Sequence, residues 1–250
     1  MSGHNKWSTI KHKKGKADAA RGKIFTKIIK EMAIAARLGG GDINSNPRLR
    51  LAVDKAKAAN MPKDNIERAI KKGTGELEGV NYEEVTYEGY GPAGVAVIIE
   101  VTTDNKNRVV AEIRHIMQKC NGNLGENGCV SFMFDRKGVM YISKETVTEE
   151  KLTEDALSLP VTDIQDDGDE FAVYCESADL YTVSNGLREM GYDPKDSGMT
   201  MIPKNYVELD EEGARRMMKL QDLLDDNDDV QDIYTNADIS DEIAAKIAEE

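Results

Sequence analysis

The chain has 250 residues, of which 40% are apolar and 32% are charged, and its formal net charge is −13. This length allows two or three globular domains, and no apolar run approaches the ~20 residues of a membrane-spanning helix, so we expect no membrane association. The cysteines Cys120, Cys129 and Cys175 form no CxxC pair, which excludes a disulfide framework or a zinc finger. Because the first residues also lack the apolar stretch of a signal peptide, we expect a cytoplasmic protein.

The two ends of the chain differ strongly in charge. Residues 1–75 contain 18 Lys and Arg against 6 Asp and Glu, whereas residues 76–250 contain 15 against 40. Clustered cations gain affinity for nucleic acid because they release counterions from its phosphates, and an acidic surface is repelled. The sequence therefore predicts a nucleic-acid-binding N-terminal domain attached to an acidic remainder.

The N-terminal region is predicted to be helical. Residues 1–15 contain no acid and few apolar residues, which is typical of a mobile arm. A helix is expected from about 16 to 38, before three consecutive glycines, and a second begins at Asn46-Pro47 with Asn as N-cap. A third covers about 64–72. These elements predict a basic three-helix domain at residues 1–78.

Lysines recur on one side of the first helix, opposite its apolar face. We interpret this as a solvated stripe that grips phosphates, and Arg48 and Arg50 offer bidentate contacts to phosphate or guanine. Trp7 is expected either to stack on a base or to fold back onto the helices. Replacing Lys23, Lys27 and Lys30 of this stripe by Glu is expected to abolish polyanion binding with thermal stability nearly unchanged. The candidate nucleic-acid-binding residues are Lys6, Trp7, Lys11, Lys13, Lys14, Lys16, Lys23, Lys27, Lys30, Arg48 and Arg50.

The remainder alternates between β-branched runs and amphipathic segments. Strands are predicted at about 85–90, 95–103, 129–134, 139–143, 163–165, 171–175, 199–202 and 230–234. Helices are predicted at about 105–119, 145–158, 178–190 and 211–224. This order fits an α+β multidomain fold. After the helical first domain come two ferredoxin-like βαββαβ units, the second and third domains, and the third is inserted in the second. The predicted boundaries are 79–136 with 205–240 for the second domain, 137–204 for the third, and 241–250 for a C-terminal tail.

No motif in the chain indicates catalysis, a cofactor or a metal. Residues 89–94 match GxGxxG, but a strand follows where a dinucleotide site needs a helix, so a hairpin connection is expected. The acidic run 225–229 lacks the Gly and Glu that a calcium loop requires. His115 is interpreted as a partly buried structural histidine. We therefore expect a protein that is not an enzyme and has no cofactor or metal.

Several motifs closely resemble the YebC family. They are Gly3-His4-Asn5-Lys6-Trp7-Ser8, Arg21-Gly22-Lys23-Ile24-Phe25-Thr26-Lys27, Leu38-Gly39-Gly40-Gly41-Asp42, Asn46-Pro47-Arg48-Leu49-Arg50, Tyr87-Glu88-Gly89-Tyr90-Gly91-Pro92, Gly122-Asn123-Leu124-Gly125, Met201-Ile202-Pro203 and Asp228-Asp229-Val230-Gln231. The resemblance implies a helical N-terminal domain and two α+β domains, the third inserted in the second. It assigns no catalytic residues.

The resemblance also implies a role in gene expression. Bacterial members are generally described as DNA-binding transcriptional regulators of the cytoplasm, and the related mitochondrial protein is a translational activator for a cytochrome oxidase subunit. Some bacterial members resemble ribosome-associated factors that ease the elongation of difficult peptide sequences. We therefore expect a monomeric, non-enzymatic nucleic-acid-binding regulator, whose polymer is DNA or ribosomal RNA. A ribosome-binding translation factor and a protein-interaction adaptor are the alternatives.

Overall fold

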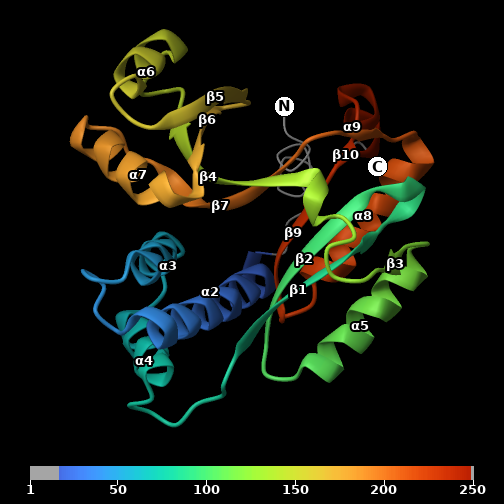
Figure 1. The fold of residues 1–250 in the computed structure, drawn as a ribbon, viewed down its shortest axis with the longest axis horizontal. Coiled ribbons are helices and arrows are strands. Elements are labelled where there is room, and N and C mark those ends of the chain that lie inside the picture. The colour runs from blue at the N-terminus through green and yellow to red at the C-terminus, as the bar shows by residue number, and fades with distance from the viewer. Residues whose placement is uncertain (1–16, 249–250) are drawn as a thin grey trace. The chain divides into compact units, whose positions relative to one another are not determined.

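A computed structural model of the chain describes residues 17–248 (Figure 1). Within this range the chain forms two compact units. One consists of residues 134–204, and the other of residues 17–133 together with 205–248. Each unit is described by itself.

The N-terminal part of the larger unit is a three-helix domain. It contains α2 (Ala17–Gly39), α3 (Pro47–Ala58) and α4 (Lys63–Thr74). The predicted cap of α3 is confirmed, because the Asn46 side chain accepts a hydrogen bond of 3.1 Å from the Leu49 amide. Both α3 and α4 pack on α2 (Figure 1) around buried Met32, Leu49 and Val53. A Cβ on Gly73 would lie 2.3 Å from the carbonyl oxygen of Ala33, so only glycine allows α4 to approach α2 this closely.

The larger unit continues as an α+β domain that is split in sequence. Before the insertion it contains β1 (Glu83–Tyr90), η1 (Pro92–Gly94), β2 (Ala96–Thr103), α5 (Lys106–Lys119), β3 (Asn123–Leu124) and η2 (Ser131–Met133). After the insertion it contains β8 (Val207–Glu208), α8 (Glu211–Asp225), β9 (Val230–Thr235), β10 (Ala237–Asp238) and α9 (Asp241–Ala248). The main sheet has the antiparallel order β3-β1-β2-β9, and β8 pairs with β10 in parallel.

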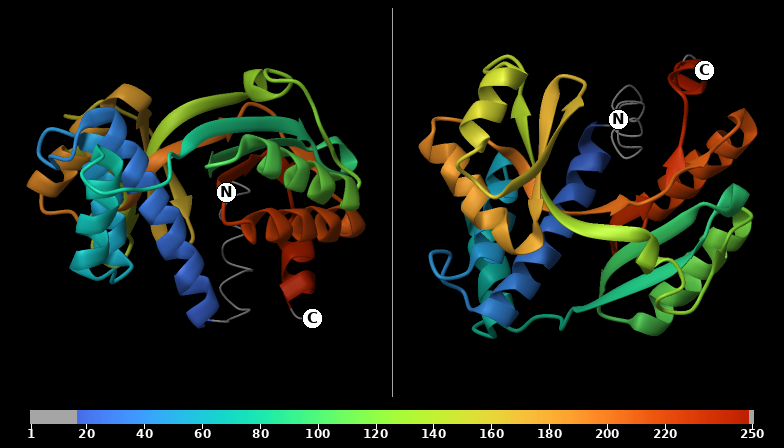
Figure 2. Two further views of the ribbon diagram at one scale, coloured as in Figure 1. Left: turned by 90° about the horizontal axis from the view of Figure 1, so that it is seen from below. Right: turned by 45° about the horizontal axis from the view of Figure 1, so that its top comes forward.

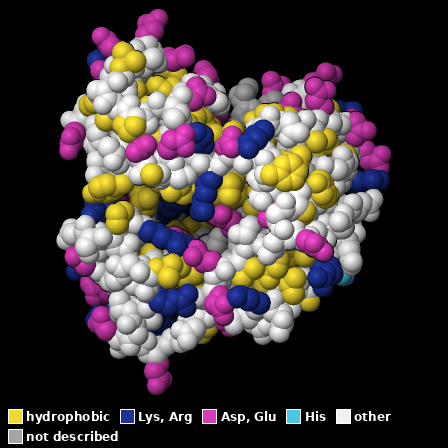
Figure 3. Space-filling model, viewed as in Figure 1, with side chains coloured by type: hydrophobic (Ala, Val, Ile, Leu, Met, Phe, Trp, Pro, Cys, Tyr) yellow, Lys and Arg dark blue, Asp and Glu magenta, His cyan; other side chains and the backbone are white. Residues whose placement is uncertain are grey.

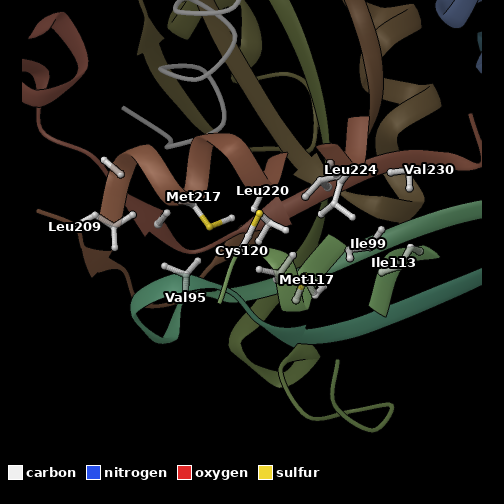
Figure 4. Packing of buried hydrophobic residues seen from close by; sticks show 14 of the residues in the cluster. Val95, Ile99, Ile113, Met117, Cys120, Leu209, Met217, Leu220, Leu224 and Val230 are labelled. Atoms are coloured by element: carbon white, nitrogen blue, oxygen red, sulfur yellow. The ribbon is translucent and has the colours of Figure 1, made fainter. Parts of the chain in front are cut away.

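One hydrophobic core holds this split domain together. Helices α5 and α8 lie side by side on one face of the sheet (Figure 2). Met117 of α5 and Cys120, which caps α5, contact the same core as Met217 and Leu220 of α8, over Val95 just before β2 (Figure 4). All five side chains are buried. The segment predicted to be a C-terminal tail is mostly helix α9, which packs against this core through its apolar residues.

The inserted unit is a second α+β domain. It contains β4 (Phe134–Ser143), α6 (Glu149–Ala156), β5 (Val161–Asp167), β6 (Glu170–Glu176), η3 (Ser177–Asp179), α7 (Leu180–Glu189) and β7 (Lys195–Pro203). Its antiparallel sheet has the order β5-β6-β4-β7, in which Phe134 lies opposite Pro203. This is the ferredoxin-like order that the sequence predicts. The sheet of the split domain has the same arrangement, except that β1, which takes the sheet position of the third strand of a βαββαβ unit, comes first in the chain.

One predicted strand is wrong, and a second is longer than predicted. Strands were expected at 129–134 and 139–143, but residues 131–133 form η2 and a single strand, β4, runs from Phe134 to Ser143. β4 continues through Gly138, where the missing side chain lets the Cys175 side chain lie close to the strand. A Cβ at this position would be 2.7 Å from Sγ of Cys175. The predicted fold class, with three domains and the third inserted in the second, is confirmed.

Candidate nucleic-acid interface

The structure describes five of the eleven candidate residues. Lys23, Lys27 and Lys30 lie on α2, and Arg48 and Arg50 lie on α3. The other six are outside the described residues: Lys6, Trp7, Lys11, Lys13, Lys14 and Lys16.

Lys30 is buried, and its ammonium group is fully hydrogen-bonded inside the larger unit. Its Nζ donates to Oδ1 of Asp229 at 2.5 Å, to the carbonyl oxygen of Asp228 at 2.6 Å and to that of Thr102 at 3.3 Å. These three acceptors use all three N–H groups of the ammonium. Only 6% of the Lys30 side chain is exposed, so the expectation of a solvated lysine is wrong at this position.

Asp229 is the centre of this contact. Its other carboxylate oxygen accepts hydrogen bonds from Oγ1 of Thr103, at 2.9 Å, and from the guanidinium of Arg108. Burial opposes ionisation of Asp229, but the hydrogen bonds from Lys30, Arg108 and Thr103 outweigh it and hold its pKa below the ordinary value. Asp229 is therefore ionised at neutral pH, and its contact with Lys30 joins α2 to the end of the loop after α8.

The other two lysines of the stripe that the structure describes, Lys23 and Lys27, also contact the loop that contains Asp229. Nζ of Lys23 lies 2.6 Å from Oδ1 of Asp226, and Nζ of Lys27 lies 3.4 Å from Oδ1 of Asp225. The Lys23 and Lys27 side chains are 39% and 22% exposed, so solvent screens these pairs more than the Lys30 pair. We name residues 225–229 the acidic loop. It neutralises the lysine stripe that the sequence assigned to phosphate.

The two arginines of α3 are also held by internal contacts. Arg48 forms a bidentate pair with Glu31, at 2.9 and 3.0 Å, and a second pair with Glu84 of β1. Burial lowers the pKa of Arg48, but the two carboxylates more than compensate and raise it. Arg50 donates to the carbonyl oxygens of Ile43 and Asn44 and so fixes the loop after α2. Both guanidinium groups therefore connect elements of the larger unit.

Other cations of the helical domain remain exposed without an ion pair in the described structure. On α4 these are Arg68, Lys71 and Lys72, which share one face because their spacing is i, i+3, i+4. Ile66 and Ala69 bury the opposite side of the helix. We name these three cations the α4 face. They belong to the basic excess of residues 1–75, although they are not among the eleven candidate residues.

The remaining motifs are structural. Residues 89–94 connect the antiparallel strands β1 and β2, so the predicted hairpin is confirmed. His115 is exposed, and the expectation of a partly buried histidine is wrong. In the part of the chain that the structure describes, no three His, Cys, Asp or Glu residues are arranged to hold a metal, and no helix could cross a membrane.

An open depression lies in the inserted domain between α6 and the end of α7. Its lining includes Lys151, Asp155 and Tyr192. The Tyr192 hydroxyl donates to Asp155 at 2.5 Å. Burial and this hydrogen bond raise the pKa of Tyr192 to about 12, and hydrogen bonds from Lys151 and Tyr192 lower the pKa of Asp155. Neither group is poised to exchange a proton near neutral pH, as a general acid or base requires.

Comparison with known proteins gives consistent matches along the chain. A family model described as the TACO1/YebC protein N-terminal domain matches residues 5–76, and one described as the TACO1/YebC second and third domain matches residues 82–237. A protein of Geobacter sulfurreducens named probable transcriptional regulatory protein is 59% identical over 247 residues, which cover 99% of this chain and 100% of the relative. A protein of the same name from Geotalea uraniireducens is 57% identical over 242 residues, covering 97% and 98%.

Comparison with solved structures also gives a match. It is the crystal structure of a conserved hypothetical protein from Aquifex aeolicus, with a TM-score of 0.84 and 46% sequence identity. The match covers 90% of this chain and 93% of that chain. The similarity therefore extends over both compact units.

Proposed function

The chain belongs to the TACO1/YebC family, and from this we propose that it is a non-enzymatic regulator of gene expression whose helical domain binds nucleic acid. The names of its relatives support a regulatory role. The observation that carries the binding proposal is the α4 face, three exposed cations on one side of a short helix in a domain with excess positive charge.

The exposed cations of this domain suit contacts to a phosphate backbone. Lys71 and Lys72 lie in the last turn of α4, where the helix carbonyls favour positive charge, and Arg68 supplies a planar donor fork. Lys55 of α3 is also exposed and has no ion pair in the described structure. Contacts of this kind give affinity without base recognition, so they fit either DNA or RNA.

Replacing the α4 face tests the proposal. The variant R68Q/K71Q/K72Q can no longer neutralise three phosphates, so the slope of log K against log salt should fall by about 2 to 3. The measurement is fluorescence anisotropy with a 30-nucleotide single strand, as DNA and as RNA of the same sequence. The control is K106Q/R216Q/K246Q, which removes the same charge from exposed ion pairs of the split α+β domain. Equal binding by the two variants would contradict the proposal.

The acidic loop should compete with nucleic acid for the lysine stripe. In the variant D225N/D226N, Lys23 and Lys27 lose their internal partners and become free to contact phosphates, so binding at 50 mM salt should tighten roughly tenfold. The control is D228N/D232N, which removes two exposed acids whose side chains contact none of these lysines. If both variants tighten binding equally, the effect comes from the overall charge of the protein. Competition between the acidic loop and nucleic acid for the lysine stripe would then be contradicted.

A further inference from the structure

One aromatic side chain of the split α+β domain is held in solvent. Phe132 lies in η2 and is 67% exposed, more than any other aromatic residue that the structure describes. Figure 3 shows hydrophobic side chains at the surface where this segment leads into β4. A phenylalanine gains free energy when it leaves water. The cause of its exposure must therefore lie in the backbone that carries it.

Strand β1 fixes this backbone through a buried carboxylate. The Glu88 carboxylate accepts hydrogen bonds at 2.8 to 2.9 Å from three backbone amides, those of Gly128, Val130 and Ser131. The last of these residues directly precedes Phe132. Breaking one of these bonds would leave a buried charge with one donor fewer, so the carboxylate holds the chain in one conformation.

Another residue of β1 holds the same segment, residues 121–133, which we name the Phe132 loop. The Tyr90 hydroxyl donates a hydrogen bond of 3.3 Å to the carbonyl oxygen of Cys129. The Val130 side chain is fully buried and anchors the loop on its inner side. These contacts keep the loop from rotating the Phe132 ring inward, so the ring is displayed at one place on the surface.

The charges of this loop and of its domain do not suit a nucleic acid. The Phe132 loop contains no Lys or Arg, and its one charged residue, Glu126, is exposed. The split domain as a whole holds 20 Asp and Glu against 8 Lys and Arg in residues 82–133 and 205–248. Proteins that stack aromatic side chains on bases use cations beside them to bind the phosphates. The loop lacks such cations, and the acids of its domain repel phosphate.

The same features suit a protein partner. The anchors of protein interfaces are aromatic side chains that fill a pocket and lie within a polar rim. The Phe132 loop combines its exposed aromatic ring with exposed uncharged polar side chains, namely Asn121, Asn123, Asn127 and Ser131. Because hydrogen bonds already fix the loop, binding would order little further chain, which favours affinity.

We propose that the Phe132 loop is the docking site for a basic protein, which receives the Phe132 ring in an apolar pocket. Positive charge around that pocket would complement the acid excess of the split domain and raise the rate of association. The polar side chains of the loop would hydrogen-bond at its edge. This site goes beyond the proposed function, because it adds a protein contact that does not involve the cations of the helical domain.

The test places a photoreactive residue on the same loop in the full chain. The substitution Asn127→p-benzoyl-phenylalanine leaves Phe132 intact, and irradiation of the cells that naturally make the protein shows what lies against the loop. We expect a crosslink to one protein. The variant F132S should reduce it at least about tenfold, because loss of an aromatic anchor lowers affinity by that much or more. The matched control Y206S removes an exposed aromatic ring elsewhere in the same domain and should leave the crosslink unchanged.

The crosslinked protein is then purified, and its affinity for the chain is measured by isothermal titration calorimetry. F132S should weaken binding at least about tenfold. Thermal unfolding of F132S should match that of the parent, because the ring is exposed. A lower unfolding temperature would show that the ring is packed inside the domain and would overturn the proposal.

The other outcomes separate this site from the proposed function. No crosslink, a crosslink that does not depend on Phe132, or an acidic partner would each overturn the docking site. Weaker binding of F132S to the 30-nucleotide strand, or a crosslink to nucleic acid, would overturn it as well, since Phe132 would then stack on bases. The proposed function is judged by R68Q/K71Q/K72Q on that strand, whatever F132S does to the protein contact.

Discussion

Replacement of Lys30 by Met is expected to lower the free energy of unfolding by about 3–5 kcal/mol, because it leaves the buried Asp229 carboxylate without its main partner. The measurement is urea denaturation, read as a shift of the midpoint at constant slope. Lys23→Met is the matched control. It removes a lysine of the same stripe whose ion pair is exposed, so its cost should stay within about 1 kcal/mol.

A double variant separates the ion pair from packing. K30M/D229N removes both charges and should be more stable than the sum of the single costs predicts, because no unpaired buried charge remains. If Lys30→Met costs no more than Lys23→Met, the buried pair does not join α2 to the acidic loop as described.

The Lys30–Asp229 pair predicts that the free energy of unfolding depends on pH. The folded-state pKa of Asp229 lies below its ordinary value, so its stabilisation is complete above the unfolded-state pKa and is lost as pH falls through the folded-state value. The difference in stability between the parent and K30M/D229N should therefore shrink as pH is lowered from about 5 towards about 2. A constant difference would contradict this assignment.

Replacement of Glu88 by Gln is expected to cost about 2–4 kcal/mol, because an amide cannot accept every hydrogen bond that the carboxylate accepts. The carboxylate of this buried residue accepts from the backbone amides of Gly128, Val130 and Ser131 at 2.8 to 2.9 Å. Burial alone would raise the pKa of Glu88, but these three hydrogen bonds lower it. Glu88 thus fixes the segment that leads from the split domain into β4.

The control for Glu88 lies in the same segment. Glu126 is exposed, so Glu126→Gln should change the free energy of unfolding by less than about 0.5 kcal/mol. Urea denaturation of both variants is the measurement. Similar stabilities would show that the three amides find other acceptors when the carboxylate is absent.

The sequence predicted the lysine stripe of α2 but not what the stripe contacts. Helical periodicity places Lys23, Lys27 and Lys30 on one face whether they contact water, phosphate or carboxylates. Their partners follow about 200 residues later in the chain, in the acidic run that lacks the Gly and Glu of a calcium loop. The run of aspartates had no local explanation, and that was the one available sign of a distant basic partner.

Local patterns were reliable where the physical cause was local. The Asn46-Pro47 cap and the hairpin at residues 89–94 were predicted because cap and turn chemistry act over a few residues. The prediction that a strand begins only at Val139 was wrong because β4 already includes Gly138. This glycine makes room for the Cys175 side chain, which the sequence pattern does not show. The α4 face has a related cause, since only the structure shows which cations have partners.

The register of β4 and β7 has a consequence for how the chain folds. Phe134 and Pro203 are directly opposite each other, so the inserted domain leaves the split domain and returns to it at nearly the same place. While the insertion is unfolded, the two halves of the split domain must close a loop of about 70 residues; once it folds, the loop is effectively a few residues long. The difference in loop-closure entropy is about 3 kcal/mol. Folding of the insertion first would therefore lower the entropic cost of bringing β9 beside β2.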